Sequence, residues 1–217
     1  MPWLSPFLGV LGPLESQKAG SCAILRCPAV AGSVARSMMR FLTILAIVFV
    51  ACQTGCDRAA DPDLVAAQPV SGWPDTKIVS QVGRIYFAGQ PSEAALRLAA
   101  AEGVGLVINL RPMQEMAKVP FDERALVAEL GMRYVTIPVM PSTFSLADVD
   151  RFADQLSTTD GPVLFHCSTS NRCGGLWAVY LVREHGAGWD EALALGKAAG
   201  LSRESMIEAA QRVAQEL

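Results

Sequence analysis

The chain has 217 residues, of which 51% are hydrophobic and 18% charged, and its formal net charge is −3. This composition excludes a disordered chain, because the apolar fraction is large enough to build a core. It also argues against a nucleic-acid partner, since there is no basic excess to neutralise phosphates.

The first notable element is an apolar segment near the N-terminus. Phe41–Ala51 is too short to span a bilayer, which takes about 20 apolar residues, but it matches the apolar region of a secretory signal preceded by Arg40. Ala51 then precedes Cys52, and this junction resembles a bacterial lipoprotein cleavage site. The resemblance implies that Cys52 is lipidated and becomes the mature N-terminus. An uncleaved anchor helix is the alternative.

Charge and composition divide the chain at this segment. Residues 1–56 carry a net charge of +3 and the remainder carries −6. We expect an exported protein of the cell envelope or periplasm, attached to the membrane by lipid at Cys52 or by the signal segment. The expected boundaries are a disordered leader at 1–37, with translation beginning at Met38 or Met39, a signal or anchor at 38–56, a tether at 57–76 and a folded domain at 77–217.

The folded domain alternates strand and helix patterns. Alternation at this spacing, with strands that are apolar throughout, predicts a three-layer α/β domain whose central sheet is largely parallel. The expected strands are 84–88, 105–110, 133–139 and 162–167, and the expected helices are 93–102, 121–130, 145–156 and 176–184, with two more opened by Asp190 and Ser202.

The chemistry is expected after the last strand, where a short polar loop leads into a helix. Small polar residues allow such a loop to curl so that its backbone N–H groups point inward and bind an anion. Those groups and Arg172 favour the thiolate of Cys167, which makes Cys167 a candidate nucleophile and Arg172 a phosphate ligand. The other residues expected to contact substrate are His166, Ser168, Thr169, Ser170, Asn171 and Cys173.

Four stretches carry a resemblance to a known family: residues 85–91, 107–112, 133–138 and 166–172. Together they resemble the dual-specificity-like cysteine phosphatases grouped with bacterial beta-lactamase-hydrolase-like proteins. The resemblance implies that Cys167 attacks phosphorus to form a phosphocysteine and that Arg172 stabilises the transition state. It implies a phosphorylated substrate and no cofactor.

The loop departs from the common phosphatase pattern at two positions. Ser170 replaces a glycine and tolerates a positive φ less well. Cys173 stands where a Ser or Thr usually assists departure of the thiolate. Because an exported thiol meets an oxidising compartment, we predict that Cys167 and Cys173 can form a reversible disulfide.

The general acid is not evident. Cysteine phosphatases usually take it from an Asp on a loop after an earlier strand, but Met140–Ser145 contains no carboxylate. Asp148 is our candidate. Asp150, Glu115 and Asp122 are weaker ones, since each fits a surface charge or a helix N-terminal residue.

Two alternatives remain open at this stage. A rhodanese-like sulfurtransferase also uses a Cys and an Arg separated by four residues, although its usual Asp-x-Arg becomes Asn109-Leu-Arg111 here. A catalytically weak module that binds phosphate or a phosphoprotein is favoured by Ser170, Cys173 and the missing acid. With two histidines and no cluster of His, Cys and carboxylates, the sequence predicts no metal site.

Overall fold

A computed structural model describes residues 61–217, and the expected leader, signal segment and Cys52 lie outside the described residues. Among residues 61–217, no helix is long and apolar enough to cross a membrane. The strands of this part of the chain join in one sheet, and helices lie on both of its faces.

The centre of the fold is a six-stranded sheet in the order β1-β2-β3-β6-β4-β5. The strands from β3 to β5 in this order run parallel, and β1 and β2 add an antiparallel extension at one edge. The expected largely parallel sheet is therefore confirmed. The strands are β1 (Gln68–Pro69), β2 (Val79–Val82), β3 (Ile85–Ala88), β4 (Leu106–Asn109), β5 (Arg133–Thr136) and β6 (Val163–His166).

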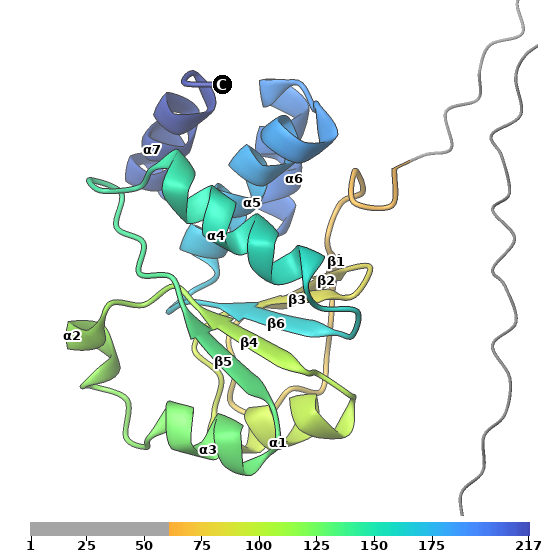
Figure 1. Cartoon of the computed structure of the whole chain (residues 1–217), viewed down its shortest axis with the longest axis vertical. Helices are drawn as coiled ribbons and strands as arrows, with labels where there is room; N and C mark the ends of the chain where they lie inside the picture. The colour runs from red at the N-terminus through yellow and green to blue at the C-terminus, as the bar shows by residue number, and fades with distance from the viewer. Residues whose placement is uncertain (1–60) are drawn as a thin grey trace, which may run out of the picture. The chain divides into compact units, whose positions relative to one another are not determined.

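Helices cover both faces of this sheet, which gives the predicted three layers. Figure 1 shows α1 and α3 on one face and α4, α5, α6 and α7 on the other. Every residue of β4 and β6 is buried, as expected for central strands covered on both sides. The helices are α1 (Glu93–Ala101), α2 (Met113–Met116), α3 (Glu123–Glu129), α4 (Leu146–Ser157), α5 (Asn171–His185), α6 (Trp189–Ala198) and α7 (Glu204–Ala214).

The segment before β2 is packed rather than extended as a tether. Gln68 and Pro69 pair with β2, and Trp73 is only 7% exposed, with its ring centroid 5.3 Å from that of Tyr86. Proline is tolerated in this two-residue strand because β1 lies at the sheet edge. The expectation of a tether at 57–76 is therefore wrong from residue 61 onward.

Helix α5 begins at Asn171, five residues before the expected start at 176. Gly174 and Gly175 lie inside the helix, where their lack of a side chain permits close packing. A Cβ on Gly174 would lie 2.3 Å from the carbonyl oxygen of Gly196 on α6, and one on Gly175 would lie 2.7 Å from Met206 on α7. The glycine pair therefore seats α6 and α7 behind the loop that follows β6.

Candidate active site

The strand β6 delivers Cys167 to the base of the loop at 167–172, which we call the signature loop. Cys167 is fully buried, and its N–H donates to the carbonyl of Ala88 at 3.3 Å. A hydrogen bond from the Cys173 thiol, backbone N–H donors of Thr169 and Arg172, and the Arg172 charge lower the pKa of Cys167 to about 5. At that pKa the sulfur is about 99% thiolate at pH 7. The inward-pointing N–H groups expected from the sequence are present.

Cys173 is the other half of this thiol pair. It is fully buried in the first turn of α5, and burial together with the Cys167 thiolate raises its pKa well above the usual value. Cys173 therefore remains a thiol and donates its S–H to Cys167. Both cysteines are free.

Ser170 adopts the left-handed conformation that a glycine would adopt more easily, with φ at 61°. This conformation costs about 1–2 kcal/mol for a residue with a Cβ. The Ser170 hydroxyl donates to the carbonyl of Ala199 at 2.7 Å, which offsets part of that cost. Gly200 makes the close approach possible, because a Cβ there would lie 2.6 Å from the Ser170 Cβ. The serine thus preserves the curl of the loop.

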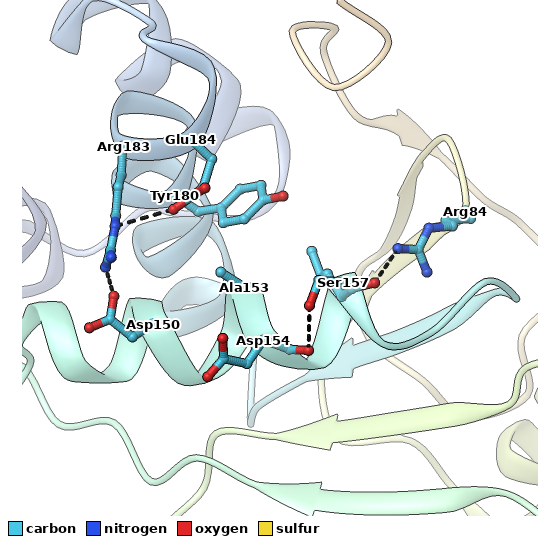
Figure 2. Close-up of a pocket in the computed structure, with 9 residues that line it drawn as sticks. Arg84, Asp150, Ala153, Asp154, Ser157, Tyr180, Arg183 and Glu184 are labelled. Carbon is cyan, nitrogen blue, oxygen red and sulfur yellow. Dashed lines mark hydrogen bonds and ion pairs between the residues drawn. The ribbon is translucent and has the colours of Figure 1, made fainter. Parts of the chain in front are cut away.

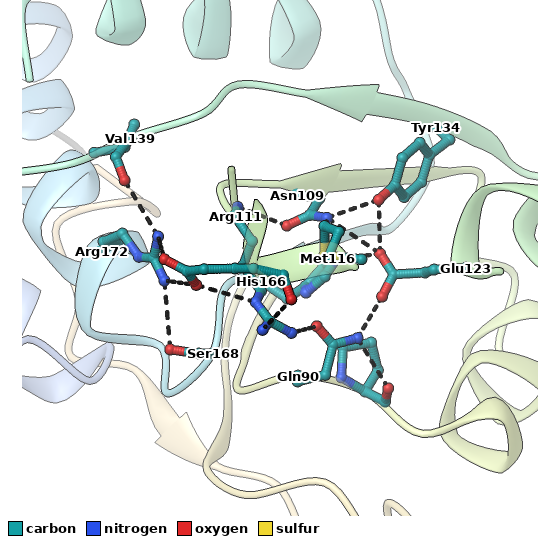
Figure 3. Close-up of polar contacts among 12 residues, drawn as sticks. Gln90, Asn109, Arg111, Met116, Glu123, Tyr134, Val139, His166, Ser168 and Arg172 are labelled. Atoms are coloured by element: carbon teal, nitrogen blue, oxygen red, sulfur yellow. Dashed lines mark hydrogen bonds and ion pairs between the residues drawn. The ribbon is translucent and has the colours of Figure 1, made fainter. Parts of the chain in front are cut away.

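Arg172 is held by Glu115, which the sequence indicated only as a weaker candidate for the general acid. Its Nη2 lies 2.7 Å from Oε2 of Glu115, and its Nη1 lies 3.0 Å from Oε1. Nη1 also donates to the Val139 carbonyl at 3.3 Å, and Nη2 to the Ser168 hydroxyl at 3.4 Å, as Figure 3 shows. The hydrogen bond from Arg172 outweighs burial and lowers the pKa of Glu115, so this carboxylate is ionised at neutral pH.

A pocket of about 170 Å³ opens over this arrangement. It is smaller than the pockets that hold drug-sized ligands and suits a group of phosphoryl size. Of the residues expected to contact substrate, Ser168, Thr169 and Asn171 line it, together with Arg172. The remaining lining residues are Glu115, Met140, Pro141, Arg203 and Ser205.

His166 does not line this pocket. It is fully buried, and its Nε2 lies 3.0 Å from Oε1 of Glu123, a residue of α3 that is only 2% exposed. Tyr134 donates its hydroxyl to the same oxygen at 2.9 Å (Figure 3). Burial alone would raise the pKa of Glu123, but His166 and the hydrogen-bond donors outweigh the effect of burial, so the pKa of Glu123 is lowered. Glu123 therefore braces His166, the residue before Cys167. Ser170 and Cys173 likewise lie behind the pocket wall.

The carboxylates considered as general acids lie elsewhere, except for Glu115. Asp148 accepts the backbone N–H and hydroxyl of Ser145, both at 3.1 Å, in a capping box that opens α4. Asp150 pairs with Arg183 beside a separate pocket of about 410 Å³, shown in Figure 2. Asp122 caps α3. Neither Asp148 nor these two alternatives lines the pocket of the signature loop.

A cluster in the described part of the chain could hold a metal ion, although the sequence predicted none. Asp61, Asp63 and His185 each place a ligand atom within 4.8 Å of the others. His185 Nδ1 lies 2.5 Å from Asp61, and Nε2 lies 3.5 Å from Asp63. The two carboxylates thus contact the two different nitrogens of the imidazole ring. These contacts attach the segment around residue 61 to the end of α5.

Comparison with known proteins agrees with the geometry. Residues 82–183 match the model of the phosphatase-like domain of beta-lactamase hydrolase-like proteins. A beta-lactamase hydrolase-like protein of Xylella fastidiosa (strain Temecula1) is 34% identical over 126 residues, covering 57% of this chain and 29% of that protein. One from Agrobacterium fabrum is 33% identical over 98 residues, covering 44% and 23%. The chain thus spans less than a third of these curated relatives.

Solved structures of cysteine phosphatases share the fold. Pseudomonas aeruginosa TpbA superposes with a TM-score of 0.56 at 22% identity, covering 70% of this chain and 90% of that one. Tk-PTP gives a TM-score of 0.54 at 19% identity, covering 67% and 100%. The structural likeness shows a phosphatase-type fold, and residues 82–183 are similar to the phosphatase-like domain of beta-lactamase hydrolase-like proteins.

Proposed function

We propose that this chain is a phosphomonoester phosphatase of the protein-tyrosine or dual-specificity type that works through a phosphocysteine. The observation that carries the proposal is the Cys167 sulfur, whose pKa is lowered to about 5 by the Cys173 thiol, two loop N–H groups and Arg172. A low-pKa thiolate beside a guanidinium and converging N–H donors is the arrangement that nucleophilic attack on a phosphate ester needs.

The reaction proceeds in two displacements. The Cys167 thiolate attacks phosphorus, a sulfur–phosphorus bond forms, and the ester oxygen leaves with the bonding electrons. Arg172 and the N–H groups of the loop bind the non-bridging oxygens as negative charge builds on them. Water then attacks phosphorus, inorganic phosphate leaves, and the sulfur departs as a thiolate that the Cys173 S–H stabilises.

A phosphorylated tyrosine is the substrate type that we propose for a first test. TpbA, which shares this fold, has been crystallised in complex with phosphotyrosine. Among residues 61–217, the only carboxylate lining the pocket is Glu115, which is ionised and hence a poor proton donor. Aryl phosphates need the least protonation of the leaving group, which favours them over alkyl phosphates.

The test uses the full chain with p-nitrophenyl phosphate, beside the Cys167→Ser and Arg172→Lys variants. We expect phosphate release from the wild type and a loss of at least about 100-fold in each variant. Assays with thiosulfate and cyanide run in parallel. Thiocyanate formation would instead identify a sulfurtransferase, and phosphate binding without turnover would indicate a phosphate-binding module.

We also propose that the protein is exported and lipid-anchored at Cys52, on the evidence of the apolar segment and the Ala51–Cys52 junction. Labelling cells with a radioactive fatty acid tests this. Label should appear in the wild type and be absent from Cys52→Ser. Equal labelling of the two, or none in either, contradicts the anchor.

A further inference from the structure

A second arginine faces the pocket of the signature loop, and neither the sequence prediction nor the proposed reaction uses it. Arg203 lines the same pocket of about 170 Å³ as Arg172, Ser168 and Thr169. It is the N-cap residue of α7, more than thirty residues after the signature arginine. The fold therefore brings two guanidinium groups to one small cavity.

The backbone of Arg203 is tied to the signature loop itself. The side-chain oxygen of Asn171 accepts hydrogen bonds from the N–H groups of Ser202 and Arg203, both at 2.8 Å. Asn171 immediately precedes Arg172 in the chain. The position of the second arginine is thus fixed relative to the first, although its side chain is exposed.

The charges of the pocket are not balanced. In the described part of the chain Glu115 is the only carboxylate that lines it, and Glu115 is already bound by Arg172 and by Nε of Arg111 at 3.2 Å. Within residues 61–217, the guanidinium of Arg203 has no hydrogen bond or ion pair to any other residue. A phosphoryl group bound by Arg172 and the loop N–H groups would leave Arg203 as an unmatched cation at the edge of the substrate.

We infer that Arg203 is a specificity residue and that the substrate is a phosphomonoester carrying a second anionic group. The inference rests on the proposed function, since the first anion is the phosphoryl group that Cys167 attacks. The second anion is a carboxylate or another phosphate that meets Arg203 while the ester phosphate occupies the signature loop. Arginine suits both groups because its planar fork donates two parallel hydrogen bonds.

The test compares three aryl phosphates of similar leaving group: 3-carbamoylphenyl phosphate, 3-carboxyphenyl phosphate and benzene-1,3-diyl bisphosphate. The first is neutral at the second position, and the other two carry the two candidate anions. In the wild type we expect kcat/KM for at least one of the two substrates with a second anion to exceed that for the carbamoyl compound by about tenfold. A gain of this size lies between the contribution of an exposed ion pair and that of a charge-assisted hydrogen bond. The substrate with the higher kcat/KM shows whether the second anion is a carboxylate or a phosphate.

Variants show whether Arg203 causes the preference. Arg203→Gln should abolish the preference, and Arg203→Lys should keep part of it. Arg97→Gln is the matched control, because Arg97 lies on α1 at the opposite face and pairs with Glu129 at 3.5 Å. The preference must survive in that variant.

A binding measurement keeps this inference separate from the proposed function. In Cys167→Ser, pyrophosphate should bind more tightly than inorganic phosphate, and adding Arg203→Gln should remove the difference. If the wild type hydrolyses none of the three esters, the phosphatase proposal fails. The comparison of pyrophosphate and inorganic phosphate binding then still decides the role of Arg203. Hydrolysis with no anion preference, or with a preference that Arg203→Gln leaves intact, would overturn the inference.

Discussion

The contact between the two thiols gives the sharpest test of the site. Replacing Cys173 by Ala removes the donor that contributes most to the low pKa of Cys167. A hydrogen bond to a charged group is worth about 1.5–3 kcal/mol, and 1.36 kcal/mol corresponds to one pH unit, so the pKa should rise from about 5 to about 6–7. The N–H groups of Thr169 and Arg172 remain, which keeps the value below that of a free thiol.

The sign and size of the effect are readily measured. At pH 6 the wild-type sulfur is about 90% thiolate, and in Cys173→Ala it should be about 10–50%. Alkylation by iodoacetamide between pH 4 and 9, quantified by mass spectrometry of the peptide that contains Cys167, reports the midpoint without relying on enzymatic activity. Cys173→Ser is the control, because its hydroxyl keeps a donor and should hold the midpoint near the wild-type value. A midpoint unchanged in Cys173→Ala, or equally raised in both variants, refutes the reasoning.

Three further predictions concern the surroundings of that sulfur. Gly200→Ala should destabilise the protein by about 2–4 kcal/mol in thermal or urea unfolding, because the added Cβ would lie 2.6 Å from the Ser170 Cβ of the signature loop. Gly131→Ala is the control: Gly131 also has a positive φ but has open space around it, so the substitution should cost only about 1–2 kcal/mol. Air exposure should join Cys167 and Cys173 in a disulfide, and free thiols at both positions in the unreduced protein would contradict this. Glu115→Gln should tighten inorganic phosphate binding, measured by calorimetry, by about three- to tenfold, since a carboxylate that repels the dianion is removed. That gain should persist through the neutral range and vanish only as the pH falls through the lowered pKa of Glu115, and weaker binding would show that Glu115 instead serves to hold the arginine.

The sequence predicted the parts of this site that are contiguous in the chain. Cys167, Arg172 and the polar residues between them follow a buried strand and precede a helix, so their geometry is set by local structure. The same reasoning predicted four of the six strands, because three are short, largely apolar runs bounded by turn residues and the fourth, 133–139, is rich in β-branched and aromatic residues. It missed β1 and β2, since two residues that include Pro69 and the half-polar run Val79–Val82 give no such signal.

Residues contributed by distant segments could not be predicted in the same way. Glu115 lies on a four-residue helix, and Glu123 lies on α3, so only the folded chain shows that one meets Arg172 and the other meets His166. Asp148 illustrates the reverse error. The spacing of Ser145 and Asp148 is that of a capping box, and this signal was available in the sequence to explain the carboxylate without chemistry.

The position of Glu115 explains how a site without an evident general acid could still support phosphatase chemistry. In the free protein Arg172 binds this carboxylate through both terminal nitrogens, so its charge is compensated before substrate arrives. An incoming phosphate dianion competes for the same guanidinium, and any loosening of that pair raises the proton affinity of Glu115 toward its ordinary value. Substrate binding therefore moves this pocket carboxylate toward the protonated state that a leaving oxygen requires. The dependence of kcat on the pKa of the leaving group measures how far Glu115 becomes protonated. This dependence should be steep for the wild type if Glu115 stays ionised and shallow if Glu115 donates its proton.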